Sequence, residues 1–505
     1  MYFILMILAA SAPDTLWSNV TSGGVYSTVE VGDLNGDGVP DVASGVNFWD
    51  EQPTLWCISG SDGTTLWSSD QYKGIYQDEG LTGVPDMDSD GYCDILLATP
   101  GGYAPPGRCM ILVSGIDGSL IWQWSAYQNI PSGAGWGYSC TTMDDQTGDG
   151  LPEFIGGFGS TGSAYTSAAV CMNGASGDTI WTRTTADAVE DVLAVPDMTQ
   201  DGVQEVILGI GGSSYTDYTV ELVDGSDGSL IWSRMGGGDV MCVDDLDRED
   251  TLPWVVSSSF SGEVRCHDLG GTQIWARVLG GYLLDVESGP DLNGDGIAEV
   301  AVAGDDAGTV CLDGATGSTL WSYPTGSNTW SVAWADSVET GGLWVPCIVG
   351  GSVNGYRITL CDANTGALQW EQDFPERVYN VSSIMMDAVS SSPVIMAGLQ
   401  DQQPMPDHAW AFLSSTGTSV GGGAPEAFTG RMIGSNPVSG SLPLRPPSGE
   451  WECSVYDLSG RLLISEVVEG NTQIDVSGWN AGCYVVVLSG GGQELRETFT
   501  VLSKR

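Results

Sequence analysis

A nine-residue acidic segment recurs along this chain, and its spacing limits the folds that the chain can adopt. The first copy reads DLNGDGVPD and a late copy reads DLNGDGIAE. The five full copies occupy residues 33–41, 86–94, 145–153, 197–205 and 291–299. Weaker copies start at Asp245, Asp336 and Asp387, which makes eight starts spaced 45 to 59 residues apart. Repeats of this length are typical of solenoids, propellers and other modular arrays.

A second motif keeps step with the acidic segment and ends in tryptophan. It reads DGTTLW at 62–67 and DGSLIW at 117–122. Its tryptophans are Trp67, Trp122, Trp181, Trp232, Trp275, Trp321 and Trp370. The chain opens with an unpartnered DTLW at 14–17, whereas the last unit ends at 415–420 without a tryptophan. The opening segment can therefore supply the missing fourth strand of the last unit and close a ring.

The residues between these marks alternate between apolar and polar, as half-buried strands do. The first unit contains four such segments, at 25–32, 41–46, 53–59 and 64–69. Four-stranded units of this length are typical of β-propeller blades. We therefore predict an all-β fold, with a propeller of eight blades over residues 13–420 and seven blades as the alternative count. The repeated tryptophans occupy one repeat position, which favours packing between blades.

The acidic segment has the residue types of a calcium loop. Asp33, Asn35 and Asp37 stand at alternate positions, so their side chains converge, and Gly38 permits a sharp turn. The Val39 carbonyl and the Asp41 carboxylate complete the expected oxygen cage. The same positions in the five loops make up the predicted ligand set: Asp33, Asn35, Asp37, Val39, Asp41, Asp86, Asp88, Asp90, Tyr92, Asp94, Asp145, Thr147, Asp149, Leu151, Glu153, Asp197, Thr199, Asp201, Val203, Glu205, Asp291, Asn293, Asp295, Ile297 and Glu299.

These loops predict about five structural Ca²⁺ sites, which stabilise blades and need not take part in catalysis. An EF-hand opens in the same way, but it needs a Glu at position twelve and flanking helices, and here each loop runs into a strand. The alternative is a set of Asx-rich turns without metal. The loop at 245–253 lacks the glycine and the closing acid, and those starting at 336 and 387 are expected to be metal-free.

Two family resemblances follow from these motifs. The run TVEVGDLNGDGVPDVASG at 28–45 resembles the FG-GAP or VCBS-type repeat of integrin-like and secreted bacterial propellers. The DGSLIW turns resemble the tryptophan-docking motif of PQQ-type eight-bladed propellers. These resemblances imply the fold and calcium, but they say little about function. The cofactor residues of the PQQ enzymes do not carry over, because the chain has no adjacent cysteine pair.

The last part of the chain has a different pattern. A Gly-rich linker at 421–432 precedes residues 433–505, which predict a small antiparallel β-sandwich. The pairs Asn436-Pro437, Tyr456-Asp457 and Gly460-Arg461, the Gly482-Cys483-Tyr484 strand and the basic end resemble the sorting domain of type IX secretion. This resemblance implies export by that machinery, followed by release or attachment at the cell surface.

The beginning of the chain agrees with export. Residues 2–9 are apolar and Ala10-Ser11-Ala12 fits a signal-peptidase site, so residues 1–12 are interpreted as a signal peptide. No other apolar run is long enough to span a bilayer. We therefore expect a secreted or outer-surface protein.

Charge excludes some partners. The chain has 15 Lys and Arg against 65 Asp and Glu, a formal charge of -50. Such a field repels nucleic acid and anionic membranes, and it attracts cations. We therefore expect no nucleic acid as partner.

Cysteine and histidine point to packing more than to catalysis. The cysteines that share one position on the third strand of a unit are predicted to be buried thiols: Cys57, Cys171, Cys266, Cys311 and Cys361. Cys453 and Cys483 are candidates for a disulfide. The only histidines are His267, expected at the surface, and His408, and neither belongs to a catalytic signature. We identify no catalytic constellation.

A binding face is predicted opposite the acidic loops, where the loops between second and third strands vary most. Exposed aromatic residues on such loops suit stacking on sugars or docking of a protein. The residues assigned to this face are Phe48, Trp49, Tyr103, Trp136, Phe158, Tyr165, Tyr215 and Tyr218. The connections between units add Tyr72, Tyr127 and Trp330.

The first hypothesis is thus a non-catalytic, calcium-stabilised propeller that binds a surface glycan or protein. The alternatives are a secreted polysaccharide-degrading enzyme, since some propellers of this kind are lyases, and an envelope scaffold.

Overall fold

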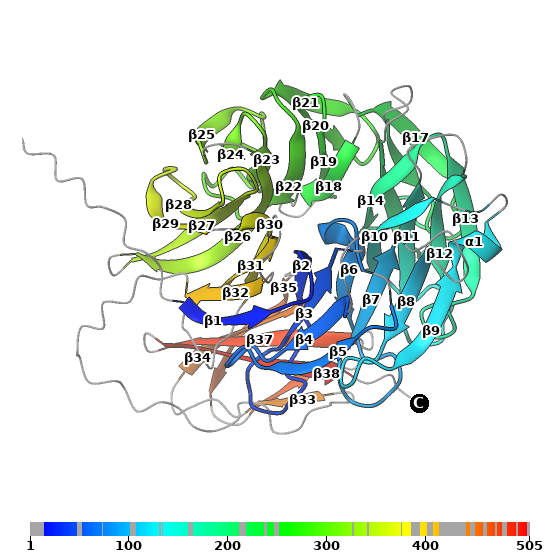
Figure 1. Cartoon of the computed structure of the whole chain (residues 1–505), viewed down its shortest axis with the longest axis horizontal. Helices are drawn as coiled ribbons and strands as arrows, with labels where there is room; N and C mark the ends of the chain where they lie inside the picture. Colours follow the sequence, from blue (N-terminus) through cyan, green and yellow to red (C-terminus); the bar gives the residue numbers. More distant parts are fainter. Residues whose placement is uncertain are drawn as a thin grey trace, which may run out of the picture.

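The computed structural model shows a ring of eight four-stranded antiparallel sheets (Figure 1). The first strands of neighbouring sheets contact one another in a closed circle around the axis of the ring. The predicted propeller and its count of eight blades are therefore confirmed.

The structure describes residues 15–47, 53–72, 74–100, 108–130, 133, 135–159, 165–211, 219–236, 240–246, 252–325, 328–340, 343–374, 376–384, 394–400, 408–413, 441–444, 450–457, 462–469, 472–476, 482–490 and 493–501. The predicted signal peptide and the linker at 421–432 lie outside these residues.

Each blade places its strands in chain order from the axis outward. The strands of blades 1 to 4 are β2 (Val25–Glu30), β3 (Val42–Val46), β4 (Leu55–Ile58), β5 (Thr65–Ser69); β6 (Leu81–Val84), β7 (Asp94–Thr99), β8 (Cys109–Val113), β9 (Leu120–Ser125); β10 (Trp136–Met143), β11 (Glu153–Gly159), β12 (Ser167–Met172), β13 (Thr179–Thr185); and β14 (Ala188–Val195), β15 (Glu205–Gly211), β16 (Thr219–Val223), β17 (Leu230–Met235). Blade 2 is entered by the 3₁₀ turn η1 (Asp78–Gly80) and followed by the short helix α1 (Ala126–Asn129).

The second half of the ring repeats this order. Its strands are β18 (Val240–Leu246), β19 (Trp254–Ser259), β20 (Glu263–Asp268), β21 (Gln273–Val278); β22 (Leu283–Ser288), β23 (Val300–Gly304), β24 (Gly308–Leu312), β25 (Thr319–Tyr323); β26 (Thr329–Thr340), β27 (Leu343–Ser352), β28 (Arg357–Asp362), β29 (Leu368–Asp373); and β30 (Arg377–Ile384), β31 (Val394–Gln400), β32 (His408–Leu413) with β1 (Thr15–Val20). Among these described strands, only blade 8 combines the two ends of the repeat region.

The ring closes as predicted. β1 pairs antiparallel with β32, from Thr15 opposite Phe412 to Val20 opposite His408. The amino-terminal strand therefore serves as the outer strand of blade 8, and it covers an edge that would otherwise be open to pairing with another chain.

The tryptophan motif works as an inter-blade dock. The indole N–H of Trp17 donates to the Gly60 carbonyl of blade 1 at 2.8 Å. Its ring lies over Gly63, where an added Cβ would come within 2.6 Å of the indole and where φ is +73°. Equivalent indole bonds start from Trp67, Trp122, Trp181, Trp232, Trp275 and Trp321. In each motif, the glycine that precedes the tryptophan in sequence therefore contacts the tryptophan ring of the preceding blade.

A bulge recurs in the innermost strands. The register with the second strand shifts at the same point in seven of the described first strands. Directly after the bulge stand Ser27, Ser139, Asp191, Cys242, Asp285, Ser331 and Asn380. Because bulges re-aim side chains, this register brings a polar group from each of these blades to one level near the axis.

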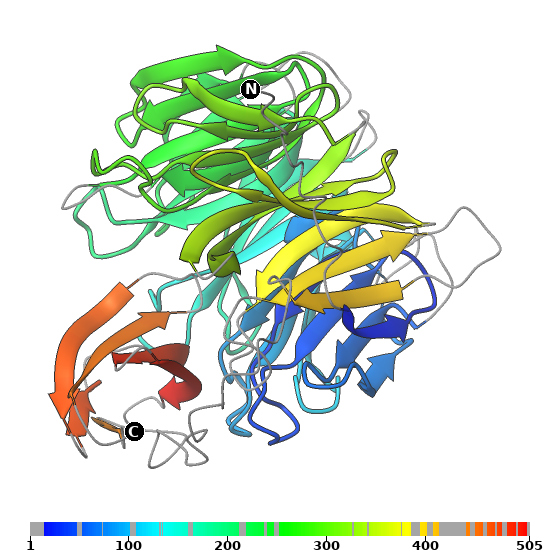
Figure 2. The same ribbon diagram turned by 90° about the vertical axis from the view of Figure 1, so that its left-hand side faces the viewer.

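The strands after residue 440 form a separate unit, drawn in orange and red in Figure 2. β33 (Ser441–Leu444) pairs with β36 (Thr472–Asp475). A second sheet has the order β35 (Leu462–Glu469), β34 (Glu450–Asp457), β37 (Gly482–Gly490), β38 (Gln493–Val501). Their own core includes Leu442, Trp451 and Val455, which agrees with the predicted small β-sandwich.

No helix in the described part of the chain is long and apolar enough to cross a membrane.

The cysteine and histidine predictions have mixed outcomes. The five repeat-position cysteines are buried thiols, as predicted. Cys453 is a buried thiol, so the suggested Cys453–Cys483 disulfide is not formed, while Cys93 takes part in a disulfide that the pattern did not reveal. The surface position predicted for His267 is wrong: its side chain is 2% exposed and packs against Trp232, because it follows Cys266 on the third strand and meets the ring that docks from blade 4.

Candidate metal centres and binding face

The five acidic loops share one hydrogen-bond pattern, which begins at the last residue of each loop. The carboxylate at position nine is buried and accepts the backbone N–H of position two, at 2.7 to 3.0 Å. In blade 1, Asp41 also accepts the N–H of Gly60 in the turn between the third and fourth strands. This residue therefore ties the loop to its blade as well as facing the loop interior.

The carboxylate at position one organises the rest of the loop. In every full copy it accepts the N–H of the glycine at position six, at 2.7 to 2.9 Å. That glycine has φ between 83° and 98° in the five copies, a region that side-chain-bearing residues avoid. The side chain at position five caps the N–H of position seven in each copy. Positions one, three and five are thereby gathered on one side of the loop.

Two loops bring three carboxylates together closely enough to hold one ion. Ligand oxygens of Asp86, Asp88 and Asp90 lie within 4.8 Å of one another, and so do those of Asp145, Asp149 and Glu153. Glu153 Oε2 and Glu299 Oε1 are buried without a hydrogen-bond partner. A buried carboxylate oxygen without a donor is costly, and a cation removes that cost. The residues present thus fit Ca²⁺, which prefers several hard oxygen ligands.

The electrostatics of the loops point the same way. Burial raises the pKa of Asp41 to about 7 and that of Asp94 to about 8, and the other acids of each loop add to the shift. Burial likewise raises the pKa of Glu299 to about 7. Without a cation these sites would thus hold protons at a pH where free carboxylates are ionised.

The three weaker copies differ in structure. Asp245 lies inside β18 opposite Val255, so it starts no loop. In blade 7, β26 and β27 continue as a paired hairpin from Ala335 to Thr340, which replaces the acidic loop. The copy at Asp387 lies outside the described residues.

A second group of acids surrounds the axis of the ring, and the sequence reading missed it. We call Asp78, Glu79, Asp191, Asp244, Asp285 and Glu287 the axial cluster. Four of them accept a backbone N–H from the next blade, at 2.6 to 3.3 Å. Asp191 bonds Val243, Asp244 bonds Ser288, Asp285 bonds Val332 and Glu287 bonds Trp334. One signal was available, since Ser27, Gly80, Ser139, Asp191 and Asp285 each stand six residues before a full acidic loop.

The segment around η1 crosses the axis. The Gln77 side chain donates to the Glu190 carbonyl of blade 4 at 2.8 Å, and the Asp78 carboxylate accepts a hydrogen bond from Asn380 of blade 8. Blades on either side of the ring are thus linked through blade 2.

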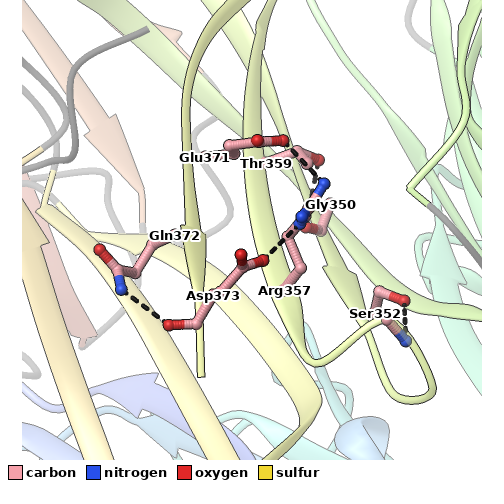
Figure 3. Close-up of polar contacts among 8 residues, drawn as sticks. Gly350, Ser352, Arg357, Thr359, Glu371, Gln372 and Asp373 are labelled. Atoms are coloured by element: carbon pink, nitrogen blue, oxygen red, sulfur yellow. Dashed lines mark hydrogen bonds and ion pairs between the residues drawn. The ribbon is translucent and has the colours of Figure 1, made fainter. Parts of the chain in front are cut away.

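Within the described residues, no ion pair joins an arginine or lysine to the axial cluster. Arg357 instead lies on the outer strands of blade 7, where it bonds Glu371 at 2.9 Å and Asp373 at 2.6 Å (Figure 3). Arg183 and Arg265 likewise pair on outer strands, with Glu221 and Glu263.

The acids of the axial cluster have raised pKa values. Burial, followed by repulsion from neighbouring acids, raises the pKa of Asp78 to about 7. For Asp191 burial again raises the pKa to about 7, despite the N–H bonds.

We predict that the calcium-free protein becomes more stable as the pH falls from about 8 to about 5.5. Acids with a raised pKa bind protons more tightly in the folded chain than in the unfolded chain, so their stability contribution is present at low pH and is lost as the pH rises through about 7. The melting temperature in chelator should rise by roughly 5 °C or more over this range. Unchanged melting at both pH values would contradict the prediction, and saturating calcium should flatten the dependence.

Aromatic rings gather on the face opposite the acidic loops, where first strands begin. Tyr26 of blade 1 stacks on Tyr379 of blade 8, with ring centroids 4.5 Å apart, and Trp330 of blade 7 lies 5.1 Å from Tyr379. All three are the extra residue of a bulge. Trp330 is 37% exposed and Arg377 donates to the Tyr379 hydroxyl. We call Tyr26, Trp330 and Tyr379 the aromatic sector.

The residues predicted for this face have mixed outcomes. Phe158 was assigned wrongly: it is fully buried on β11 and packs on Trp124. Tyr72 is buried too, with its hydroxyl bonded to the Gly118 carbonyl, whereas Tyr127 is 43% exposed. Trp136 is partly buried against Tyr76.

Six further residues were assigned to this face, and only Tyr165 lies within the described part of the chain. Tyr165 is partly buried beneath the Arg108 guanidinium, 3.8 Å from the ring centroid. Phe48, Trp49, Tyr103, Tyr215 and Tyr218 lie outside the described residues.

Comparisons with known proteins support the fold. Residues 261–500 match a family model described as outer membrane protein assembly factor BamB, so the resemblance to PQQ-like repeats is confirmed. No curated protein sequence matches the chain. The comparisons give no support to the calcium-loop or sorting-domain resemblance, and both stay predictions.

Several solved structures share the architecture at low identity. Sqt1 of Saccharomyces cerevisiae has a TM-score of 0.56 and 9% identity, covering 80% of this chain and 99% of that one. The computationally designed Ika8 protein has a TM-score of 0.53 and 14% identity, covering 79% and 99%. Quinohemoprotein alcohol dehydrogenase from Comamonas testosteroni has a TM-score of 0.52 and 12% identity, covering 84% and 78%. At such identities the likeness concerns the fold alone.

Proposed function

We propose that this chain is an exported, calcium-stabilised propeller that binds a surface glycan or protein without catalysing a reaction. The observation that carries the binding role is the aromatic sector. Three contacting rings from blades 7, 8 and 1 lie on the face away from the acidic loops: Tyr26 stacks on Tyr379, and the exposed Trp330 is tilted against Tyr379. The Arg377 guanidinium lies beside them. Stacked aromatic rings next to hydrogen-bonding groups suit the flat faces of sugars and the side chains of a protein partner.

A role in binding also agrees with the matched family. Its description is that of an assembly factor, which favours a scaffold or docking role over catalysis. His267 supplies no acid or base for chemistry on this face, because burial lowers its pKa to about 4 and it lies on the third strand of blade 5.

Calcium, in this proposal, makes the binding face rigid by holding the opposite ends of the blades. The ions would be held by the carboxylates, amides and hydroxyls at positions one, three, five and nine of the five loops, with the carbonyl at position seven. The two partnerless oxygens of Glu153 and Glu299 support this assignment. Export by a type IX route, with the final β-sandwich as sorting domain, is part of the same proposal.

The test uses the full chain with calcium on a panel of immobilised polysaccharides, with retention and new chain ends read in the same samples. We expect retention without new ends, and about a tenfold loss of affinity in Trp330→Ala and Tyr379→Ala. Leu230→Ala is the control, because Leu230 is also exposed but lies at the start of the outer strand of blade 4 and was not assigned to the binding face.

Two outcomes would redirect the proposal. New chain ends would make the protein a polysaccharide-degrading enzyme. Equal retention of the wild type and both sector variants would exclude the aromatic sector as the binding face.

A further inference from the structure

One metal-ligating group in this molecule belongs to no acidic loop. Carboxylate oxygens of Glu79 and Asp191 and the Cys242 sulfur lie within 4.8 Å of one another. Glu79 belongs to η1 of blade 2, Asp191 to β14 of blade 4 and Cys242 to β18 of blade 5. The group is therefore assembled by the closed ring, from segments that are more than 50 residues apart in sequence.

The position of each member explains how they meet. Asp191 and Cys242 both stand directly after the bulge of their first strand, so they face the axis at one level. Glu79 reaches them because Gln77 anchors its segment to the Glu190 carbonyl on the neighbouring β14. Asp191 and Cys242 are buried, and Glu79 is largely covered.

The two carboxylates of the group differ in their partners, since Asp191 accepts the backbone N–H groups of Val192 and Val243, at 2.7 and 2.9 Å. Among the described residues, no other residue donates a hydrogen bond to the Glu79 carboxylate, and no cation pairs with the cluster. Buried carboxylates are otherwise found paired or bound to metal.

Two hydroxyls near the axis are buried as well. The Ser27 hydroxyl faces the Asp78 carboxylate and lowers the pKa of that acid, against the larger effect of burial. The Ser139 hydroxyl, at the equivalent position of blade 3, is fully buried without a hydrogen-bond partner.

The donor set selects the kind of ion. Ca²⁺ binds oxygen ligands and binds thiolates poorly. Zn²⁺ accepts sulfur and carboxylate ligands together, and three protein ligands leave one position for water or for another oxygen of the cluster. We propose that Glu79, Asp191 and Cys242 form a zinc-class site on the axis of the ring, distinct from the calcium loops. The bound ion links blades 2, 4 and 5 and offsets the charge of the axial cluster.

The test is a zinc titration of chelator-treated full-length protein in the presence of excess calcium, so that the acidic loops are occupied. We expect one tight equivalent of zinc, and an affinity lowered by about 100-fold or more in Cys242→Ala. Cys311→Ala is the matched control: Cys311 is also a buried thiol, but it lies on the third strand of blade 6. Its zinc affinity should equal that of the wild type.

Cobalt absorption reports directly on a thiolate ligand, so a change in protein stability does not by itself alter it. Co²⁺ bound to the wild type should show the near-ultraviolet charge-transfer absorption of a thiolate ligand, and Cys242→Ser, which keeps the size of the side chain, should lose it. If the Cys242 variants do not fold, Glu79→Gln at its partly exposed position provides the affinity test. Zinc binding unchanged in Cys242→Ala or Glu79→Gln, or no tight zinc binding by the wild type, would overturn the proposal.

Discussion

Removal of calcium is expected to lower the melting temperature of this protein by roughly 10 °C or more. Each site filled at a hundred times its dissociation constant contributes about 2.7 kcal/mol to folding, and five loops share the same hydrogen-bonded frame. The loss should be large because, without the cation, the acids of each loop repel a fully buried carboxylate, such as Asp41, Asp94 or Glu299. The measurement is thermal unfolding in calcium and in chelator.

Matched controls separate calcium from ionic strength and from other ions. Magnesium should restore little, because it requires tighter octahedral geometry than these loops offer. Asp145→Asn should reduce the calcium effect, since Asp145 contributes to a three-carboxylate group, whereas Asp62→Asn on an exposed turn should not. Identical melting with and without calcium would rule out the loops as calcium sites and leave the Asx-turn interpretation.

Replacement of Trp17 by alanine should destabilise the ring by about 3–5 kcal/mol. The indole is 5% exposed, its N–H donates to the Gly60 carbonyl, and its ring lies over Gly63. It also belongs to the single strand that closes blade 8, so the loss weakens the pairing that joins the two ends of the repeat. Denaturant unfolding measures the change in the free energy of unfolding.

Two further variants separate the contribution of the Trp17 hydrogen bond from that of its ring, and the loss of a buried tryptophan from that of an exposed one. Trp17→Phe keeps an aromatic ring but removes the donor, so it should cost about 1–3 kcal/mol through the unsatisfied carbonyl. Trp330→Ala removes a ring that is 37% exposed and is expected to cost less than Trp17→Ala. A Trp17→Ala loss no larger than that of Trp330→Ala would contradict the docking role, and self-association of Trp17→Ala would indicate that the β32 edge had opened.

The repeat predicted most of the fold because each motif has one local cause. The first unit was expected to have strands at 25–32, 41–46, 53–59 and 64–69, and the structure has them at Val25–Glu30, Val42–Val46, Leu55–Ile58 and Thr65–Ser69. Glycines at positions with φ near 90° and alternating apolar residues specify turns and strands over a few residues. The opening DTLW predicted ring closure in the same way. It is a fourth strand that belongs to no preceding unit, and the last unit lacks its fourth strand.

The errors arose where a residue's surroundings come from another blade. Phe158 resembled a loop aromatic, but it lies near the end of β11, the second strand of blade 3, and Trp124 of blade 2 packs against it. His267 resembled a turn residue, but Trp232 of blade 4 packs against it. Neither neighbour is near in sequence, so no local pattern could have placed them.

By itself, the sequence determined the blade as a unit and the closure of the ring, because both follow from motifs that repeat along the chain. It predicted eight blades, with seven as the alternative, and it predicted the ligand set of the acidic loops. Only the tertiary structure decided what meets at the axis and on the binding face. Bulges in the first strands turn one residue of a blade toward the centre and the preceding one toward the rim. Glu79, Asp191 and Cys242, like Tyr26, Trp330 and Tyr379, become neighbours only when eight separately encoded blades share one axis.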